Sequence, residues 1–103
     1  QGDNFLVKQL SVQPGSQISL QSHGQRCEHW VVVAGRAVVE LNGDRSELAQ
    51  GQAISIKRHE KHRLINSSCE LLQIIEVQTG SYLDESDIVR YDDIYNRHLE
   101  IKE

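Results

Sequence analysis

The sequence predicts an all-β fold, an antiparallel sandwich or barrel made by a single domain of 103 residues. Short β-prone stretches recur about every 8–12 residues with Gly, Asn or Pro between them, the pattern of strands joined by tight turns. Asn42-Gly43 is the clearest hairpin signal, because both residues accept a positive φ. The strands are expected at residues 5–12, 17–23, 30–34, 37–41, 45–48, 53–56, 62–66 and 71–79.

The chain changes character after Gly80, where the strand-like alternation ends. The acidic stretch from Asp84 to Asp87 is suited to the N-terminus of a helix. The apolar residues that follow have the spacing of one helix face: Ile88, Tyr91, Ile94 and Tyr95. We therefore expect a short C-terminal helix packed on the outside of the β-barrel.

The composition, 38% hydrophobic and 25% charged, is that of an ordinary globular domain. A net charge of −4 argues against nucleic acid as the main partner. No apolar run approaches the ~20 residues that cross a bilayer, so we expect no membrane partner. Cys27 and Cys69 are too few for a disulfide framework, and we expect free thiols in the cytoplasm. Because the chain lacks methionine and begins at Gln1, we expect a trimmed chain or a domain of a longer protein.

Potential metal ligands are concentrated near residue 25. Gln21 and His23 lie two positions apart, so on a strand they point to the same face. Glu28 follows after enough residues for a short turn and a return strand, and His62 opens another strand after a polar loop. Two hairpins can therefore bring these four residues together. Their mixed oxygen and nitrogen donors suit one divalent ion, Zn²⁺ first, with Mn²⁺, Co²⁺ or Fe²⁺ as alternatives. The competing interpretation is that they are polar residues on solvated strand faces.

The spacing of these residues carries a resemblance. The pattern Q-x-H-x4-E-x6-G runs from Gln21 to Gly35, and G-x5-K-x-H-x2-H-x3-N runs from Gly51 to Asn66. Together they resemble the two motifs of the cupin superfamily. Two further segments resemble more specifically the C-terminal cupin domain of type II mannose-6-phosphate isomerases: Arg26-x-Glu28-His29-Trp30 and Glu76-Val77-Gln78-x-Gly80-Ser81-Tyr82-Leu83. That domain is usually fused to a mannose-1-phosphate guanylyltransferase. The resemblance implies one cupin jelly-roll barrel over residues 1–103, a piece of a bifunctional protein or a protein by itself.

The implied activity is that of a metal-dependent mannose-6-phosphate isomerase. Such an enzyme interconverts mannose 6-phosphate and fructose 6-phosphate, and it feeds GDP-mannose synthesis. The residues that match the family's metal positions are Gln21, His23, Glu28 and His62. Arg26 and His29 match an element for which the resemblance implies a catalytic role. His29 is a candidate base because imidazole titrates near neutrality, but it needs a bend in its strand to reach the face of Glu28.

Arg26 has a permanent charge, so it suits an enediolate or a phosphate; the alternative is an ion pair with Glu28 or Glu76. Lys57 and Arg63, from a basic run next to His62, are candidate substrate-binding residues for the phosphate, and so is Arg90. The alternative for the basic run is a solvated charged loop. Lys57 and His59 stand where the family usually has Pro and Gly.

Two other functions remain open from the sequence. The domain could be a non-catalytic module that binds a sugar phosphate, or a dioxygenase with an iron site of two His and one carboxylate. Gln21 as a fourth ligand argues against the dioxygenase. In each case the expected partner is a small molecule, and a homodimer is left open on the analogy of other small barrels.

Overall fold

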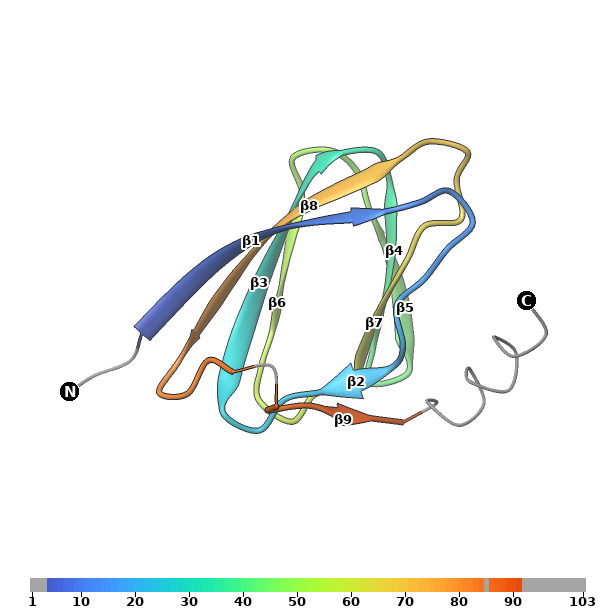
Figure 1. Ribbon diagram of the computed structural model, residues 1–103. Coiled ribbons are helices and arrows are strands. Elements are labelled where there is room, and N and C mark those ends of the chain that lie inside the picture. Colours follow the sequence, from blue (N-terminus) through green and yellow to red (C-terminus); the bar gives the residue numbers. More distant parts are fainter. Residues whose placement is uncertain (1–3, 85, 92–103) are drawn as a thin grey trace.

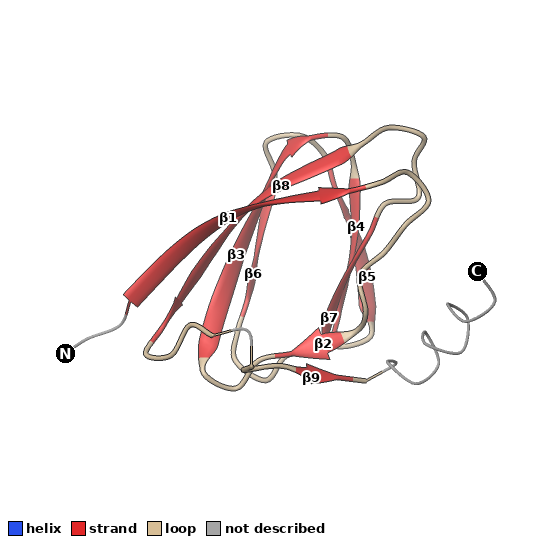
Figure 2. Cartoon of the chain, viewed as in Figure 1, coloured by secondary structure: helices blue, strands red, loops and turns tan. Residues whose placement is uncertain are grey.

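The computed structural model describes residues 4–84 and 86–91, and this part of the chain is built from strands joined by turns and loops (Figures 1 and 2). The strands are β1 (Asn4–Val12), β2 (Gln21–Ser22), β3 (Arg26–Ala34), β4 (Ala37–Leu41), β5 (Asp44–Leu48), β6 (Ala53–Ile56), β7 (His62–Ile65), β8 (Leu72–Gly80) and β9 (Val89–Arg90). All of their pairings are antiparallel. The prediction of an all-β antiparallel fold is confirmed.

The strands form two sheets that face each other. The first sheet has the order β1-β8-β3-β6, and the second has the order β5-β4-β7-β2-β9. Figure 1 shows the two sheets enclosing the interior, with β2 and β9 at the lower end of the barrel. Sequence-distant strands are neighbours in both sheets, so residues from β2, β3, β7 and β8 can meet inside.

The hairpin between β4 and β5 forms where the sequence predicts it. Asn42 has φ of 51° and Gly43 has φ of 91°, so both turn residues are left-handed. Leu41 pairs with Asp44 directly across the turn. Two positive φ values in a two-residue loop match the right-handed twist of the flanking strands, which explains why Asn-Gly stands here.

The inward-pointing side chains divide the barrel into an apolar half and a polar half. On β3 they are, in chain order, Arg26, Glu28, Trp30 and Val32, and on β8 they are Leu72, Ile74, Glu76 and Gln78. The two strands run antiparallel with Trp30 opposite Glu76. Their polar ends therefore lie at the same end of the barrel, and the Trp30 indole forms the boundary between the halves.

The apolar half is the hydrophobic core. Its buried members come from both sheets: Val12, Trp30, Val32, Ala37, Val39, Leu48, Ile56, Leu64, Leu72 and Ile74. Buried Asn66 closes this end, because its side-chain amide donates to the carbonyl oxygens of Val12 (2.9 Å) and Glu70 (2.7 Å). Burial of the apolar side chains stabilises the barrel, and the polar half is left for other chemistry.

Two predicted elements differ from the structure at the polar end. The strand expected over residues 17–23 is reduced to Gln21–Ser22, with only an isolated bridge before it. The helix expected to include Ile88 and Tyr91 is not formed at those residues, because Val89–Arg90 pairs with β2 as strand β9. The Asp87 carboxylate accepts hydrogen bonds from two amides of the β2–β3 turn and does not cap a helix. The rest of the predicted helix lies in residues 92–103, outside the described part.

Within the described residues, the structure contains no helix with the length and apolar character of a membrane span.

Candidate metal centre

Three buried side chains converge at the polar end of the barrel. His23 follows β2, Glu28 is on the inner face of β3, and His62 opens β7. One potential ligand atom from each residue lies within 4.8 Å of the others. Their exposed fractions are 3%, 4% and 1%, so all three groups are removed from bulk water. Imidazole nitrogen and carboxylate oxygen are the donors that zinc and related divalent ions prefer.

The hydrogen bonds of the two imidazoles direct their lone pairs inward. His23 Nδ1 lies 2.6 Å from the Asp87 carbonyl oxygen, and His62 Nδ1 lies 3.0 Å from the Glu60 carbonyl oxygen. A carbonyl can only accept, so each Nδ1 carries the proton and each Nε2 keeps its lone pair when the ring is neutral. The two Nε2 atoms lie 3.1 Å and 3.7 Å from the Glu28 carboxylate oxygens. This arrangement of supported imidazoles around a carboxylate fits a divalent metal ion.

The surroundings of His62 favour its neutral form. Burial of the imidazole lowers the pKa of His62 below its usual value, and the Glu60 carbonyl and the Glu28 carboxylate only partly oppose that effect. The ring also packs edge-on against the Trp30 indole, with 5.6 Å between centroids. A neutral imidazole is the form that binds metal ions, so His62 is prepared to act as a ligand near neutral pH.

Gln21, the fourth predicted ligand, is next to this group. Its backbone pairs with that of His62 across β2 and β7, and the residue lines the same cavity. Its amide nitrogen lies 3.3 Å from the Ser19 carbonyl oxygen. The amide nitrogen is therefore occupied by a hydrogen bond to Ser19, and the amide oxygen is the atom that would bind a metal. Its part in metal binding stays a prediction.

Arg26 is in contact with the candidate ligands themselves. The side chain is buried, with 6% exposed. Its Nε donates to Glu28 Oε2 at 2.9 Å, and one terminal nitrogen lies 2.8 Å from the same oxygen and 3.2 Å from His23 Nε2. The ion pair with Glu28, which the sequence left as an alternative for Arg26, is present in the structure.

A cavity of about 220 Å³ opens beside these residues. Its lining joins polar and apolar side chains: Lys8, Leu10, Ile18, Gln21, Arg26, Glu28, Trp30, His62, Glu76, Ile88 and Arg90. Lys8 and Glu76 were missing from the predicted site. The alternation Leu72, Ile74, Glu76 along β8 could have placed Glu76 on the inner face. Burial, and then the nearby Glu28 carboxylate, raise the pKa of Glu76.

Three of the predicted functional residues lie away from the cavity. His29 is exposed on the outer face of β3, with Nδ1 2.9 Å from Ser55 Oγ. The bend that it needed is absent, because β3 pairs regularly with β8 from Arg26 to Val32. Lys57 is exposed in the loop after β6, and Arg63 lies on the outer face of β7 near Glu40. Of the basic residues predicted to bind substrate, Arg90 lines the cavity.

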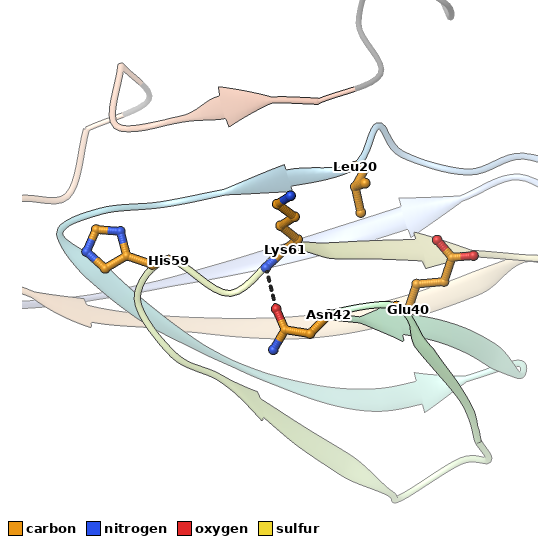
Figure 3. A pocket seen from close by; sticks show the side chains of 6 residues that line it. Leu20, Glu40, Asn42, His59 and Lys61 are labelled. Carbon is orange, nitrogen blue, oxygen red and sulfur yellow. Dashed lines mark hydrogen bonds between the residues drawn. The ribbon is translucent and has the colours of Figure 1, made fainter.

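A second, larger hollow of about 500 Å³ lies elsewhere, and Figure 3 shows it. Its lining residues are Leu20, Glu40, Asn42, Gly43, His59 and Lys61. The Lys61 backbone amide donates to Asn42 Oδ1 at 3.0 Å across it. None of the three grouped candidate ligands, His23, Glu28 and His62, lines this hollow. The smaller cavity, which contains Glu28 and His62, is therefore the better candidate for chemistry despite its size.

Two solved structures illustrate the fold that this chain shares with known proteins. A double-stranded β-helix domain protein from Klebsiella pneumoniae superposes with a TM-score of 0.74 and 22% identity, covering 84% of this chain and 73% of that one. A cupin 2 conserved barrel domain protein from Salinispora arenicola superposes with a TM-score of 0.67 and 23% identity, covering 91% of this chain and 72% of that one. At these identities the likeness establishes the fold, and the predicted cupin barrel is confirmed.

Curated relatives are much closer in sequence and much longer. A mannose-1-phosphate guanylyltransferase from Escherichia coli is 46% identical over 96 residues, which are 93% of this chain and 20% of the relative. The alginate biosynthesis protein AlgA from Pseudomonas aeruginosa is 46% identical over 99 residues, which are 96% of this chain and 21% of the relative. The chain thus spans about a fifth of the length of these proteins.

These relatives overturn the predicted function. The sequence was expected to encode a mannose-6-phosphate isomerase, but the relatives are named for guanylyl transfer or for alginate biosynthesis. A barrel that makes up a fifth of such an enzyme cannot be assigned the isomerase activity by itself. What the relatives do show is that chains like this one occur within enzymes.

The model for the C-terminal region of mannose-6-phosphate isomerases matches residues 1–93, a range that includes every residue the structure describes. The resemblance that the sequence motifs indicated is therefore confirmed. With its cupin barrel, its His-Glu-His group and this match, the chain belongs to the mannose-6-phosphate isomerase C-terminal family.

Proposed function

We propose that this chain is a metal-holding cupin domain that binds a phosphosugar within a longer enzyme of the mannose-1-phosphate guanylyltransferase type. The observation that carries the proposal is the buried group of His23, Glu28 and His62 at a cavity that basic side chains also line. The curated relatives support the phosphosugar, since one of them is named for a mannose phosphate. Binding, and not turnover by the barrel alone, is the function that these observations favour.

The metal would be held by His23 Nε2, His62 Nε2 and the Glu28 carboxylate, with Gln21 as the proposed fourth ligand. Two imidazoles and one carboxylate suit Zn²⁺ first, and Mn²⁺, Co²⁺ or Fe²⁺ as well. When bound, such an ion supplies a Lewis acid that can polarise a sugar oxygen. The carbonyls of Asp87 and Glu60 hold both imidazoles in the required tautomer.

The phosphate would be bound by basic residues of the same cavity. Lys8, Arg26 and Arg90 line it, on β1, β3 and β9 respectively. Arginine offers a planar fork for phosphate oxygens, whereas lysine offers a mobile point charge. Leu10 and Ile18 add apolar lining for the carbon face of a sugar. An anion with a polyhydroxylated body is the ligand that this combination fits.

The proposal is tested by titrating the chain with Co²⁺ and with mannose 6-phosphate, each followed by calorimetry. We expect one Co²⁺ per chain, and tighter binding of mannose 6-phosphate than of mannose. His62→Ala should remove Co²⁺ binding, whereas His29→Ala, which changes an exposed imidazole on the outer face, should not. Unchanged Co²⁺ stoichiometry in His62→Ala would overturn the metal site. Equal affinity for mannose and mannose 6-phosphate would overturn the phosphosugar.

Two further predictions belong to this proposal. Cys27 and Cys69 are free thiols in the structure, which supports a reducing compartment such as the cytoplasm. A homodimer is kept as the proposed assembly state, and sedimentation equilibrium of the purified chain would test it. A monomer across the micromolar range would remove the dimer from the proposal without affecting the metal site.

A further inference from the structure

The contacts of Arg26 point to a device that goes beyond binding. Resting on the metal site proposed above, we propose that the Arg26 guanidinium and the divalent ion exclude each other at His23. Metal loading then moves Arg26 from its partners His23 and Glu28 into the cavity, where it binds the anionic group of the ligand. Arg26 thereby couples the affinity for metal to the affinity for anion.

The exclusion follows from the single lone pair of His23 Nε2. Nδ1 of this ring donates to the Asp87 carbonyl oxygen at 2.6 Å, so Nε2 is the unprotonated nitrogen of a neutral ring. An Arg26 terminal nitrogen lies 3.2 Å from Nε2 and uses that lone pair. A carboxylate oxygen can accept from a donor and bind a metal at once, but an imidazole nitrogen cannot. Metal and Arg26 cannot both be bound to His23.

Glu28 makes the competition stronger. Arg26 Nε and a terminal nitrogen lie 2.9 Å and 2.8 Å from the same oxygen, Oε2, and both side chains are buried. The guanidinium therefore balances the charge of a carboxylate that is removed from water. A divalent ion at this carboxylate takes over that role, and its positive charge repels the guanidinium. Both the lost lone pair and the repulsion drive Arg26 away.

The cavity can accommodate the displaced Arg26 side chain. Arg26 already lines the cavity, together with Lys8 and Arg90. The residue opposite Arg26 on β8 is Gly80, so no side chain from that position obstructs its movement. A guanidinium released from Glu28 into a cavity that Lys8 and Arg90 also line becomes a strong site for a phosphate or similar dianion.

The proposed coupling between anion binding and metal binding is positive, and it acts in both directions. An anion that holds Arg26 in the cavity removes the competitor from His23 and so tightens metal binding. By thermodynamic linkage the metal must tighten anion binding by the same factor. Couplings between two sites in one protein are typically about 5–150-fold, which is the range expected here.

The first experiment measures the Co²⁺ dissociation constant without any anion, from the visible absorption of bound Co²⁺. The variants are Arg26→Met, which keeps bulk but has no donor, and Arg26→Ala. The control is Arg36→Gln, which changes an exposed arginine paired with exposed Glu47. We expect both Arg26 variants to bind Co²⁺ at least about 5-fold tighter than the wild type, and the control to be unchanged. Equal or weaker Co²⁺ binding in folded Arg26→Met would overturn the competition.

The second experiment repeats the Co²⁺ titration with saturating mannose 6-phosphate, and with mannose as the neutral control. We expect mannose 6-phosphate to tighten Co²⁺ binding to the wild type, and this effect to be lost or reduced in Arg26→Met. An equal effect in both proteins would overturn the role of Arg26 in coupling. Failure of the proposed function gives a different result, because Co²⁺ or mannose 6-phosphate then does not bind the wild type or the Arg26 variants.

Discussion

Glu28 and Glu76 share one hydrogen-bond donor, the indole N–H of Trp30. Trp30 Nε1 lies 3.1 Å from Glu28 Oε1 and 3.0 Å from Glu76 Oε1, and all three side chains are buried. Burial disfavours a second negative charge here, and the Glu28 carboxylate adds repulsion, so the pKa of Glu76 is raised above its usual 4.5. The Arg26 ion pair is on the side of Glu28. Glu76 is therefore the member of the pair that resists ionisation.

This difference predicts a pH effect of Glu76→Gln. In the wild type, the unfolded chain loses the Glu76 proton near pH 4.5 while the folded chain retains it, so stability falls as the pH rises through the raised folded pKa. The amide side chain of the variant has no proton to lose, so that fall should be absent. Urea denaturation of both proteins between pH 4 and pH 8, without metal, measures the free energy of unfolding.

The two proteins are compared by how their free energies of unfolding change with pH and not by the absolute values, because the amide also changes local hydrogen bonds. The stability of Glu76→Gln relative to the wild type should increase from pH 4.5 upwards. Glu70→Gln, at an exposed position before β8, is the control and should run parallel to the wild type. Parallel curves for Glu76→Gln and the wild type would contradict the raised pKa.

The lowered pKa of His62 predicts the opposite pH dependence of stability to that of Glu76. Burial lowers its pKa below 6.5, so as the pH falls the unfolded chain takes up a proton before the folded chain does. The stability that His62 contributes is therefore complete above pH 6.5 and is lost as the pH falls through the folded pKa. In His62→Gln this part of the acid-induced loss should disappear, as measured by thermal unfolding of the metal-free protein from pH 7.5 to pH 4.5. His29→Gln, on the outer face, should keep the wild-type profile; equal profiles for all three proteins would refute the prediction.

The sequence was sufficient to predict the barrel and the grouping of three of the four candidate ligands. Alternation with a period of two placed the strands, and Gln21, His23, Glu28 and His62 were expected together from hairpin geometry and the cupin spacing. The structure groups His23, Glu28 and His62, and it places Gln21 on the same cavity. Local patterns succeed here because strand periodicity and turn chemistry decide which face a residue occupies.

The sequence could not predict features that depend on tertiary contacts. The helix expected at Ile88 was replaced by strand β9, because the edge of β2 offered backbone partners that outweigh a two-turn helical pattern. His29 was chosen for its chemistry although its own period placed it outside. The pairing of Arg26 with Glu28 is a choice among several nearby acids, and only side-chain packing in three dimensions decides it.

The left-handed backbone conformation of His59 predicts that glycine at this position stabilises the protein. Its φ of 70° is in the left-handed region, where a residue with a Cβ is strained by about 1–2 kcal/mol. Glycine removes that strain but adds freedom to the unfolded chain, worth about 0.4–1 kcal/mol. His59→Gly should therefore be between neutral and about 1.6 kcal/mol more stable than the wild type in urea denaturation. The backbone bond from His59 N to the His23 carbonyl (2.7 Å) is kept in the variant. His59→Ala keeps the strain and is the control; if it proves more stable than His59→Gly, the strain is not present.

The close packing around Gly80 predicts that a substitution there disturbs the candidate metal centre through the backbone. It pairs with Arg26 across β8 and β3. A Cβ added at Gly80 would lie 3.0 Å from Arg26 Cα and closer still to the Gln25 carbonyl oxygen, and backbone atoms cannot rotate away as side-chain tips can. In Gly80→Ala the start of β3 must move, with a cost of about 1–3 kcal/mol for overpacking.

The same movement should reach Glu28, because Arg26 and Glu28 are consecutive inward residues of β3. We therefore expect Gly80→Ala to weaken Co²⁺ binding by the folded protein as well as to lower its stability, as measured by Co²⁺ titration and urea denaturation. Gly35→Ala is the matched control. A Cβ at Gly35 would lie 2.6 Å from the Leu71 carbonyl oxygen. This contact lies just past the C-terminal end of β3, next to the apolar half of the barrel and away from Glu28. It should lower stability and leave the Co²⁺ affinity of the folded protein unchanged. If both variants lose stability and neither changes Co²⁺ affinity, the prediction is wrong. The close approach of Gly80 to Arg26 then stabilises the barrel but does not position the candidate metal ligands.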